Sequence, residues 1–485
     1  MSLTSNPETT RLLRWNDVYS EADLYKAALR VYTKPVFQWR KALFTSSDGR
    51  TLYDFAERGL SRLGAIHKAL QRRSFAFRPA VALHYNFNGK HRTLYVPPWE
   101  ERIVDLLLYR CLNRNLHHWF SPNSYAYRDR RYSLDACQRR IANVLRSSRS
   151  PCYVVKRDIT NYFASVNHEV LLSKLASLVD STDYLYRLLA QRVRFLYEQD
   201  GQLQVSTIGI PFGASIACLF ANIYLTQLDR EVESVPDVRY FRYADDLLLL
   251  SATREAAEVA TQRLEARLTK LCLKTKPSHR ADLLLVDHPA SDATFFPAPT
   301  FRHLGLLFRA GGDVALSRDK LRKIQNLFRF AFRRNRRWKR APDLRRRVEM
   351  LVKVATEVVG RGVRNVAILD YYLKHVNDER QLRLLDRWLA EAVLAAAFGG
   401  HKKGHFRKVS FQQLRTMGLP SLVHRRRMIH SGRMESPFFI WRQARAARGF
   451  RGTVAKLCRS AGKPAFSPFP EAAASKSPVR EGGCL

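Results

Sequence analysis

The sequence predicts a mixed α+β core followed by an all-helical, strongly basic region. Between residues 76 and 312, short apolar runs typical of buried strands alternate with amphipathic segments of helical period. Beyond Asp313 almost every segment has helical periodicity. Basic residues also concentrate there, because from Val314 to the end 39 Lys and Arg stand against 12 Asp and Glu. These observations place the strands, and any site built on them, in the first two thirds of the chain.

Charge is the most informative property of the composition. The 485 residues include 83 Lys and Arg against 43 Asp and Glu, a net charge of +40 with a pI near 10.5. Such a field attracts polyanions, so nucleic acid is the expected partner, unless the charges only solvate helices. With 46% hydrophobic residues the chain is globular rather than disordered, and its length predicts two or three structural units.

The seven cysteines form no CxxC pair, which argues against a structural zinc site and against a disulfide framework. No apolar run approaches the length of a membrane span, and the first ten residues lack a signal-peptide core. We therefore expect a reduced, cytoplasmic protein with no membrane partner.

The first half of the chain begins with helices over residues 1–75, followed by a turn-rich stretch at 84–101. An amphipathic helix over 101–120 leads into a loop at 121–136 and a further helix. The Val-rich run Cys152–Asp158 is expected as a buried strand that ends in a carboxylate.

The second half of the core continues with expected helices at 166–178 and 183–199. A Gly-Ile-Pro-Phe-Gly turn at 209–213 starts a long helix. Residues 254–272 have the pattern of an amphipathic helix, and 301–309 have that of a strand pair around Gly305.

Two adjacent carboxylates are expected at the tip of a hairpin. Tyr243-Ala244-Asp245-Asp246 stands between an aromatic, basic run and four leucines, a pattern of strand, tight turn and strand. Neighbouring carboxylates repel each other unless a multivalent cation or a cationic partner lies beside them. The hairpin is therefore either a metal site or an ordinary surface turn, where Asp is common.

Asp158 supplies a second carboxylate at a strand end, with Phe163 five residues later. Two strands that each present Asp at one end can converge on a pair of divalent cations, which activate an attacking hydroxyl and stabilise a leaving pyrophosphate. Magnesium suits such oxygen ligands, with substrate phosphates completing its coordination. The alternative is that Asp158 is a turn residue and Phe163 a core residue.

Five motifs resemble the successive palm motifs of reverse transcriptases: DITNYF (158–163), GIPFGASIACLFANIYL (209–225), YADD (243–246), LKTKPSH (273–279) and HLG (303–305). Bacterial group II intron-like and defence-associated enzymes are the nearest resemblance. GKHRTLYVPPWEERIVDLLL and SYAYRDRRYSLDA are similar to the fingers motifs of that group, and FQQLRTMGLPSLVHRRRM resembles the end of its thumb region.

The resemblance covers about residues 75–310 and implies a right-hand polymerase. In this reading, 1–75 is an N-terminal helical region and 76–312 forms the fingers and palm. Residues 313–435 form a helical, RNA-binding thumb, and 436–485 a C-terminal extension with a flexible tail.

The resemblance also assigns roles to single residues. Asp158 and Asp245 would ligate two Mg²⁺ ions, with Mn²⁺ as an alternative, assisted by Asp246 and the Ile159 carbonyl. The nucleotide would meet Lys90 and Arg92 at its triphosphate, Phe163 under its sugar, and Phe212 and Gly213 beside it. Primer and template would contact the remaining assigned residues, which are Arg128, Tyr243, Leu304 and Gly305.

Two positions depart from the family pattern. Phe212 stands where the family usually has Gln beside the incoming nucleotide, which puts nucleotide choice in doubt. His279 stands where a Lys usually serves as the candidate acid for the leaving pyrophosphate, with Lys276 nearby. A histidine there would make turnover more sensitive to pH, or His279 is a polar loop residue.

The basic C-terminal region interleaves arginines with aromatic residues, a composition that suits structured RNA. We expect the aromatic residues Phe328, Phe330, Phe332 and Trp338 to pack in a helical core while the basic residues face RNA. These basic residues are Arg333, Arg334, Arg336, Arg337, Lys339, Arg340, Arg345, Arg346, Arg347, Arg425, Arg426 and Arg427.

The expected activity is RNA-directed DNA synthesis from dNTPs, with a structured non-coding RNA as template or scaffold, in antiphage defence. One alternative is a group II intron-encoded maturase and reverse transcriptase. Others are template-independent or protein-primed DNA synthesis, and an RNA-binding scaffold with an idle polymerase site. The sequence leaves the oligomeric state open, a homo-oligomer included.

Overall fold

The computed structural model describes residues 12–35, 38–87, 90–147, 152–286, 294–360, 366–402 and 404–431. The predicted C-terminal extension at 436–485 lies outside these residues. Within them, no helix is long and apolar enough to cross a membrane. The five cysteines in this part of the chain are all free thiols, as the sequence predicts.

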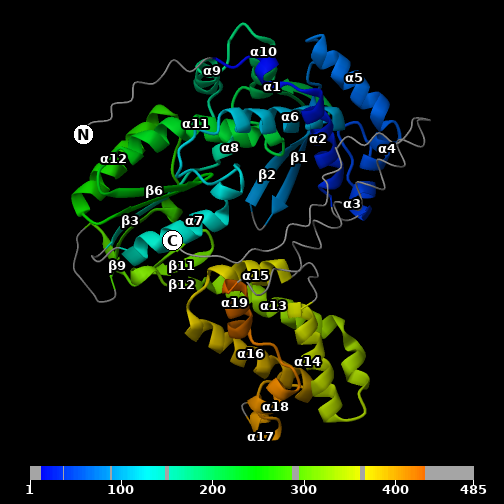
Figure 1. The fold of residues 1–485 in the computed structure, drawn as a ribbon, viewed down its shortest axis with the longest axis vertical. Coiled ribbons are helices and arrows are strands. Elements are labelled where there is room, and N and C mark those ends of the chain that lie inside the picture. Colours follow the sequence, from blue (N-terminus) through cyan, green and yellow to red (C-terminus); the bar gives the residue numbers. More distant parts are fainter. Residues whose placement is uncertain are drawn as a thin grey trace, which may run out of the picture.

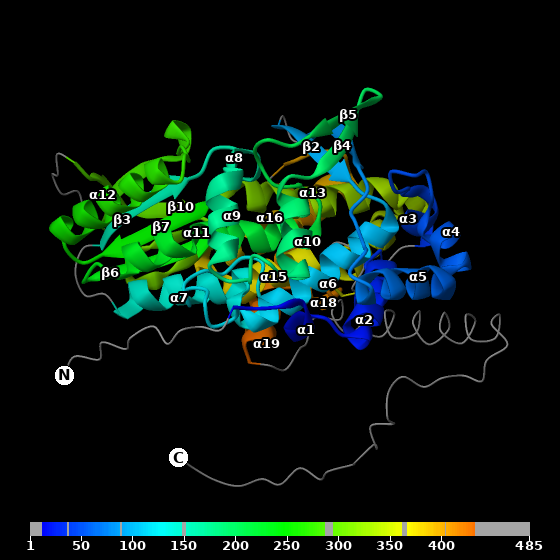
Figure 2. The same cartoon turned by 90° about the horizontal axis from the view of Figure 1, so that it is seen from above.

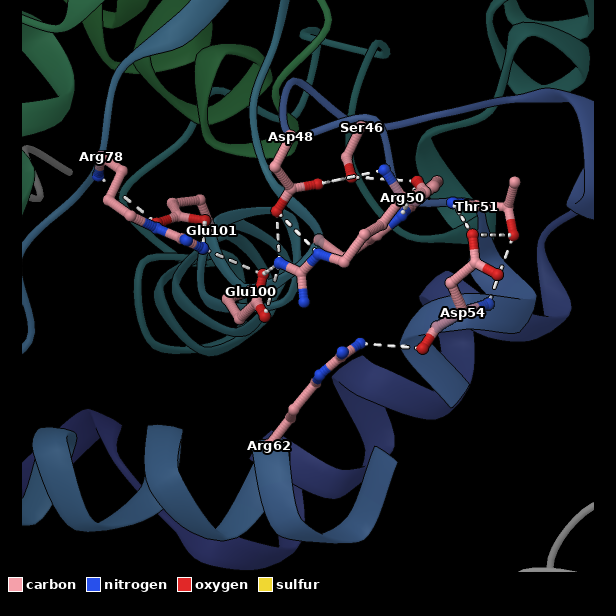
Figure 3. Close-up of polar contacts among 10 residues, drawn as sticks. Ser46, Asp48, Arg50, Thr51, Asp54, Arg62, Arg78, Glu100 and Glu101 are labelled. Atoms are coloured by element: carbon pink, nitrogen blue, oxygen red, sulfur yellow. Dashed lines mark hydrogen bonds and ion pairs between the residues drawn. The ribbon is translucent and has the colours of Figure 1, made fainter. Parts of the chain in front are cut away.

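The N-terminal helices pack on one another, and three of them pack against one long helix of the core. The N-terminal helices are α1 (Trp15–Val18), α2 (Glu21–Thr33), α3 (Gln38–Leu43), α4 (Leu52–Glu57) and α5 (Gly59–Gln71), and the long helix is α6 (Trp99–Asn115). The three that contact α6 are α1, α2 and α5. Arg50, in the segment between α3 and α4, donates to Glu100 at 2.9 Å, and Arg78, in the segment after α5, donates to Glu101 at 2.7 Å (Figure 3). These ion pairs connect the two segments to the start of α6. Glu101 is buried, which makes its pairing with Arg78 a requirement of the fold.

A four-stranded sheet contains residues that the sequence predicted as a turn-rich stretch and as the end of a helix. Its strands are β1 (Ala80–Phe87), β2 (Lys90–Val96), β4 (Leu196–Gln199) and β5 (Gln202–Val205), in the order β2-β1-β4-β5. The expectation of a turn-rich stretch at 84–101 was wrong, since most of it is the β1–β2 hairpin. The helix expected over 183–199 ends early as α10 (Tyr184–Val193), because residues 196–199 pair with β1 and β5.

The central sheet has five strands in the order β6-β7-β3-β8-β9. Their bounds are β3 (Cys152–Asp158), β6 (Val238–Tyr243), β7 (Asp246–Ser251), β8 (Ala281–Leu285) and β9 (Phe296–Ala298). The order brings two segments about 80 residues apart in the sequence, β3 and the β6–β7 hairpin, side by side.

Alternate side chains of this sheet enter two different cores. Val155 and Leu249 pack into one core with α11 (Ser215–Glu233) and α12 (Arg254–Lys270). Val154 and Leu248 pack into the other, which contains α7 (Leu134–Ser147) and the sheet formed by β10 (Thr300–His303), β11 (Leu306–Arg309) and β12 (Val314–Leu316). The short helices α8 (Tyr162–Ser165) and α9 (His168–Ala176) follow β3.

The C-terminal part is helical apart from β12, as expected. It contains α13 (Arg318–Arg334), α14 (Leu344–Gly360), α15 (Val366–His375), α16 (Glu379–Phe398), α17 (His405–Lys408), α18 (Phe411–Thr416) and α19 (Leu422–His430). This helical unit lies below the central sheet in Figure 1, next to β11 and β12. Both views place the N-terminal helices α3–α5 at the opposite end of the molecule from β6 and α12 (Figures 1 and 2).

Candidate active site

The predicted carboxylate hairpin is present. The last pair of the β6–β7 ladder is Tyr243 with Asp246, so Ala244 and Asp245 form a two-residue turn in which Ala244 has φ +58°. On the other side of β7, Asp246 is the direct ladder partner of Asp158 at the end of β3. The backbone N–H of Ile159 donates to the carbonyl of Asp245 at 3.2 Å. These pairings gather Asp158, Asp245 and Asp246 at one end of the sheet.

The three carboxylates have different electrostatic environments. Burial, reinforced by the charge of Asp158, raises the pKa of Asp245. Burial also raises the pKa of Asp246 to about 6, against attraction from Lys156. Burial opposes ionisation of Asp158 too, but hydrogen bonds from Lys276 and His279 outweigh it and lower the pKa of that carboxyl. The ionised forms of Asp245 and Asp246 are therefore disfavoured, because their protein neighbours do not fully compensate a negative charge there.

The two candidate acids lie directly on Asp158. Lys276 Nζ forms an ion pair with Oδ1 of Asp158, and His279 Nδ1 lies 3.0 Å from its Oδ2. The segment is held in place by backbone bonds, since Lys276 N–H donates to the Asp158 carbonyl at 2.8 Å and Thr160 N–H to the Lys274 carbonyl at 2.7 Å. Both residues thus reach the end of β3, where the resemblance places proton donation.

The nucleotide-side residues are brought together around Phe212. The rings of Phe163 and Phe212 meet edge to face at 5.5 Å, and the Arg92 guanidinium lies 5.5 Å from the Phe212 ring. Gly213 has φ +110°, and a Cβ there would meet Leu94 Cδ1 at 2.3 Å, so the backbone passes close to β2. Lys90 begins β2, but its side chain lies outside the described part of the structure.

Arg128 faces the protein. Its guanidinium donates to the carbonyls of Ser124 at 3.1 Å and His117 at 3.0 Å and lies 3.6 Å from the Tyr132 ring centre. These contacts fix the loop 117–128. That loop in turn pairs with β6 through Tyr125 N–H, which donates to the Arg242 carbonyl at 2.9 Å. A template contact for Arg128 stays a prediction, and its visible contacts are those of a positioning residue.

The Leu304-Gly305 turn joins β10 and β11, and both residues have positive φ, +48° and +81°. Gln138 Nε2 donates to the Leu304 carbonyl and Ser317 Oγ to the Gly305 carbonyl, each at 3.0 Å. Tyr243 is half-buried, and burial raises the pKa of its phenol. The primer contacts assigned to these residues stay predictions.

Arg242 is a residue that sequence reasoning missed. It is fully buried, donates to both carboxylate oxygens of Asp229 at 2.7 Å and to Asn222 Oδ1 at 3.1 Å, and reaches the Ala244 carbonyl at 3.4 Å. The pair thus links α11 to the turn that carries Asp245. The signal was an arginine next to the aspartate motif in a strand rich in aromatic residues, because an arginine that such a strand buries must be paired.

The basic residues of the C-terminal region divide into exposed and buried groups. Exposed positions are Arg333, Arg334, Arg336, Arg337, Lys339, Arg340, Arg345 and Arg346, whereas Arg347 is partly buried. RNA contact was wrong for Arg425, which is buried and bonded to both oxygens of Asp370 at 2.6 and 3.0 Å. Arg426 is partly buried and donates to the Val376 carbonyl at 2.6 Å, and Arg427 pairs with Glu379 at 3.0 Å.

The aromatic residues of the same region also divide. Phe328, Phe332 and Trp338 are buried as expected, and Trp338 Nε1 donates to the Phe332 carbonyl at 2.9 Å. Phe330 is 52% exposed, so its assignment to the core was wrong. The side chains at 328 and 332 are four residues apart on α13 and share its buried face, while 330 lies on the opposite face.

The donor chemistry of the site fits a divalent cation only in part. Among the described residues, no group of three or more His, Cys, Asp or Glu side chains lies close enough together to hold a metal ion alone. The three aspartates nevertheless offer oxygen ligands at one end of the sheet, two of them with raised pKa values. Magnesium commonly completes such an incomplete set with substrate phosphates and water.

Comparisons with known proteins give one family-model match and several partial relatives. Residues 86–305 match the family model described as reverse transcriptase (RNA-dependent DNA polymerase). Retron Ec83 reverse transcriptase of Escherichia coli is 28% identical over 125 residues, 25% of this chain and 39% of the relative. Protein YkfC of E. coli K12 is 23% identical over 218 residues, 37% of this chain and 55% of the relative.

A third relative is the uncharacterized 91 kDa protein in cob intron of Schizosaccharomyces pombe, 22% identical over 171 residues, 35% of this chain and 21% of the relative. The chain thus spans from about a fifth to about half the length of these curated relatives.

Among solved structures, apo telomerase from Candida tropicalis is 12% identical with a TM-score of 0.40, over 79% of this chain and 66% of that chain. Telomerase from Candida albicans with a TWJ fragment of telomeric RNA is 11% identical with a TM-score of 0.40, over 81% and 71%. The family match spans the strands that carry Asp158, Asp245 and Asp246 and the turn at Leu304-Gly305. The chain therefore carries a reverse transcriptase domain, which spans residues 86–305.

Proposed function

We propose that this protein is an RNA-directed DNA polymerase that adds dNTPs to a primer on a non-coding RNA template. The observation that carries the proposal is the ladder pairing of Asp158 with Asp246, next to the Asp245 turn, inside the reverse transcriptase domain. Buried carboxylates of this kind cost stability, so an idle scaffold would have no use for all three.

Asp158 and Asp245 are the proposed Mg²⁺ ligands, with the Ile159 carbonyl beside them and Asp246 in support. Bound metal ions supply Lewis-acid activation of the primer hydroxyl and charge stabilisation at the leaving pyrophosphate. Lys276 Nζ pairs with Asp158 Oδ1, and His279 Nδ1 lies 3.0 Å from Oδ2, so both contact a proposed metal ligand. The Phe163 and Phe212 rings, with Arg92 against the latter, form the proposed nucleotide side, where Phe163 excludes a ribose 2′-hydroxyl.

The activity can be tested on the protein purified with its RNA. We expect DNA products that map to that RNA when dNTPs and Mg²⁺ or Mn²⁺ are supplied, and none from Asp245→Ala/Asp246→Ala. Glu255→Ala, an exposed carboxylate on α12, is the matched control and should retain activity. RNA products would contradict the role of Phe163. A wild-type protein without any product would favour the scaffold alternative.

We further propose a cytoplasmic role in antiphage defence, together with a bound non-coding RNA; the relative named as a retron reverse transcriptase supports the polymerase activity that this role requires. The maturase alternative is supported by the relative in the cob intron. Sequencing the RNA that copurifies with the protein separates them, because a ribozyme-like intron would support the maturase and a short discrete RNA the defence role. Synthesis that persists after complete RNA removal would instead indicate template-independent or protein-primed activity.

A further inference from the structure

The Phe163 ring, which the proposed function places under the sugar of the nucleotide, has three aromatic neighbours. Between ring centres, Phe212 lies 5.5 Å from it, Tyr162 5.9 Å and Tyr127 6.1 Å, with interplanar angles of 85°, 78° and 84°. These are edge-to-face arrangements, in which aromatic rings attract each other. The three neighbours come from the 209–213 turn, from α8 and from the connection between α6 and α7.

Tyr162 and Tyr127 differ in how the protein uses their hydroxyl groups. Tyr162 is buried, and its hydroxyl donates to the Ala221 carbonyl at 2.5 Å, so it is a core residue between α8 and α11. Tyr127 is only half-buried. Within the described part of the chain its hydroxyl makes no hydrogen bond, and this oxygen reaches solvent. Core packing therefore accounts fully for Tyr162 but only in part for Tyr127.

The backbone of Tyr127 is strained and firmly held. Its φ of +60° lies in a region that bulky residues rarely occupy. Its carbonyl accepts hydrogen bonds from the Tyr109 hydroxyl at 2.7 Å and from Asn113 Nδ2 at 2.8 Å, both on α6. The preceding carbonyl, of Ala126, accepts from Asn222 Nδ2 of α11 at 2.9 Å. Such strain persists where several contacts over-determine the backbone, and it clusters at functional sites.

Tyr127 is also close to a proposed metal ligand. Burial, reinforced by Cys218 and Asp245, raises the pKa of the Tyr127 phenol. Asp245 therefore lies near enough for its charge to act on this hydroxyl, which stays protonated and neutral. Tyr127 thus adjoins both the ring of Phe163 and the carboxylate at the tip of the β6–β7 hairpin.

Selection by Phe163 depends on how little its ring can move. An apolar surface by itself discriminates weakly against a ligand that carries one additional hydroxyl. A ring that packing holds within about 0.5 Å of its position rejects that hydroxyl by collision, whereas a ring that can shift admits it. The helix α8 that carries Phe163 has only four residues, and no side chain caps its start. The position of the ring is therefore set by its neighbours.

We propose that Tyr127 is a positioning residue for nucleotide selection, because its ring holds Phe163 where it rejects a ribose 2′-hydroxyl. The inference rests on the proposed function, since it concerns the nucleotide side of that site. It extends that function by assigning selectivity to a residue that acts through Phe163. The role requires the ring of Tyr127 rather than its hydroxyl, since the ring makes the contact.

The test measures kcat/KM for addition of one dNTP, and of the matching rNTP, by the full-length protein with its RNA. We expect Tyr127→Leu, which lacks the ring, to lower the dNTP-to-rNTP ratio by about two- to tenfold, the factor that one edge-to-face contact represents. The change should come from faster use of rNTP, with kcat for dNTP near wild type. Tyr127→Phe keeps the ring and should keep the ratio.

Tyr186→Leu is the matched control, because Tyr186 is a half-buried tyrosine of the same core on α10. It should leave the ratio unchanged. A second variant, Tyr109→Phe, leaves the ring of Tyr127 intact and removes a single oxygen atom. It loses one of the two hydrogen bonds to the Tyr127 carbonyl, so the ratio should fall in the same direction as in Tyr127→Leu.

A double variant shows whether Tyr127 acts through Phe163. Phe163→Ala should have a low ratio, and Phe163→Ala/Tyr127→Leu should have the same ratio. A further fall in the double variant would overturn the positioning role in favour of direct contact between Tyr127 and the nucleotide. Wild-type ratios in both Tyr127→Leu and Tyr109→Phe would overturn the inference and leave the polymerase activity standing. A wild-type protein that makes no DNA would reject the proposed function, and this inference with it.

Discussion

At the scale of single residues, the buried pair of Arg242 and Asp229 lies behind the turn that carries Asp245, because Arg242 also reaches the Ala244 carbonyl. Arg242→Lys keeps the charge but cannot reproduce the two parallel bonds to Asp229. We expect a larger fall in kcat than change in KM for dNTP, measured by primer extension. Arg242→Met leaves Asp229 buried and unpaired, which should cost about 3–5 kcal/mol of unfolding free energy. In Arg242→Met/Asp229→Leu, stability should recover while kcat does not.

Lys276 gives a second prediction at this scale, through metal titration. Its ammonium group occupies Oδ1 of Asp158, so it competes with a cation for that oxygen. Lys276→Met should therefore reach half-maximal activity at a several-fold lower Mg²⁺ concentration, whatever its effect on kcat. Lys274→Met removes an exposed neighbouring lysine and is the matched control. An unchanged or higher Mg²⁺ requirement in Lys276→Met would contradict this competition.

At the scale of elements, the close passage of the 209–213 turn against β2 depends on Gly213. Gly213→Ala places a Cβ against Leu94 at a φ that L residues avoid, which should cost about 1–3 kcal/mol of stability. Gly64→Ala is the contrasting control, because nothing lies within 4 Å of its Cβ position on α5 and alanine favours the helix by about 1 kcal/mol. Thermal unfolding should shift downwards for the first variant and upwards for the second.

The sequence predicted those elements whose local pattern matched their final pairing. The YADD hairpin has two clear strands and a short turn, so its strand, turn and strand followed from the residues alone, whereas the pairing of Tyr243 with Asp246 did not. The β1–β2 hairpin was missed although Asn88-Gly89 is a strong hairpin signal, because charged residues interrupt its alternation. Residues 196–199 continue a helical pattern and become a strand only by pairing with β1 and β5, contacts that a local pattern does not contain.

The candidate site was predictable to a similar degree. The aspartates and Phe163 belong to contiguous motifs, so their positions were visible in the sequence. Other contacts of the site join segments 13 to 121 residues apart, which a local pattern does not show. They are the bonds of Arg242 to Asp229 and Asn222, and the contacts of Lys276 and His279 with Asp158. The burial of Arg425 was equally hidden, since its partner Asp370 is 55 residues away.

At the scale of the whole molecule, one carboxylate connects the reverse transcriptase domain to the C-terminal helices. Asp135 on α7 accepts from His375 at 2.6 Å and from Lys374 at 3.1 Å, both on α15. Although burial opposes ionisation, these bonds lower the pKa of Asp135 to about 2. A carboxyl whose pKa is lower in the folded than in the unfolded protein stabilises the fold above its unfolded pKa, and this contribution is lost as pH falls from about 4 to 2.

Asp135→Asn should therefore lower the unfolding free energy at pH 7 by about 2 kcal/mol and flatten its fall between pH 4 and 2. Chemical denaturation across this pH range measures both effects. Asp319→Asn, which removes an exposed pair with Arg302, is the control and should change stability little. If the unfolding free energy of Asp135→Asn fell between pH 4 and 2 as steeply as that of the wild type, the contact of Asp135 with α15 would not contribute to stability.

The contacts of Lys276 and His279 with Asp158 also have a consequence for folding before any substrate or metal is bound. Because the Lys276 ammonium group pairs with Asp158 within the protein, the chain can complete its fold without waiting for a metal. A newly made molecule would then tolerate a cell poor in free magnesium, and a purified one should withstand chelator with an unchanged unfolding temperature. The proposed activity would then depend on the concentration of free metal ion, whereas the amount of folded protein would depend only on how much is synthesised.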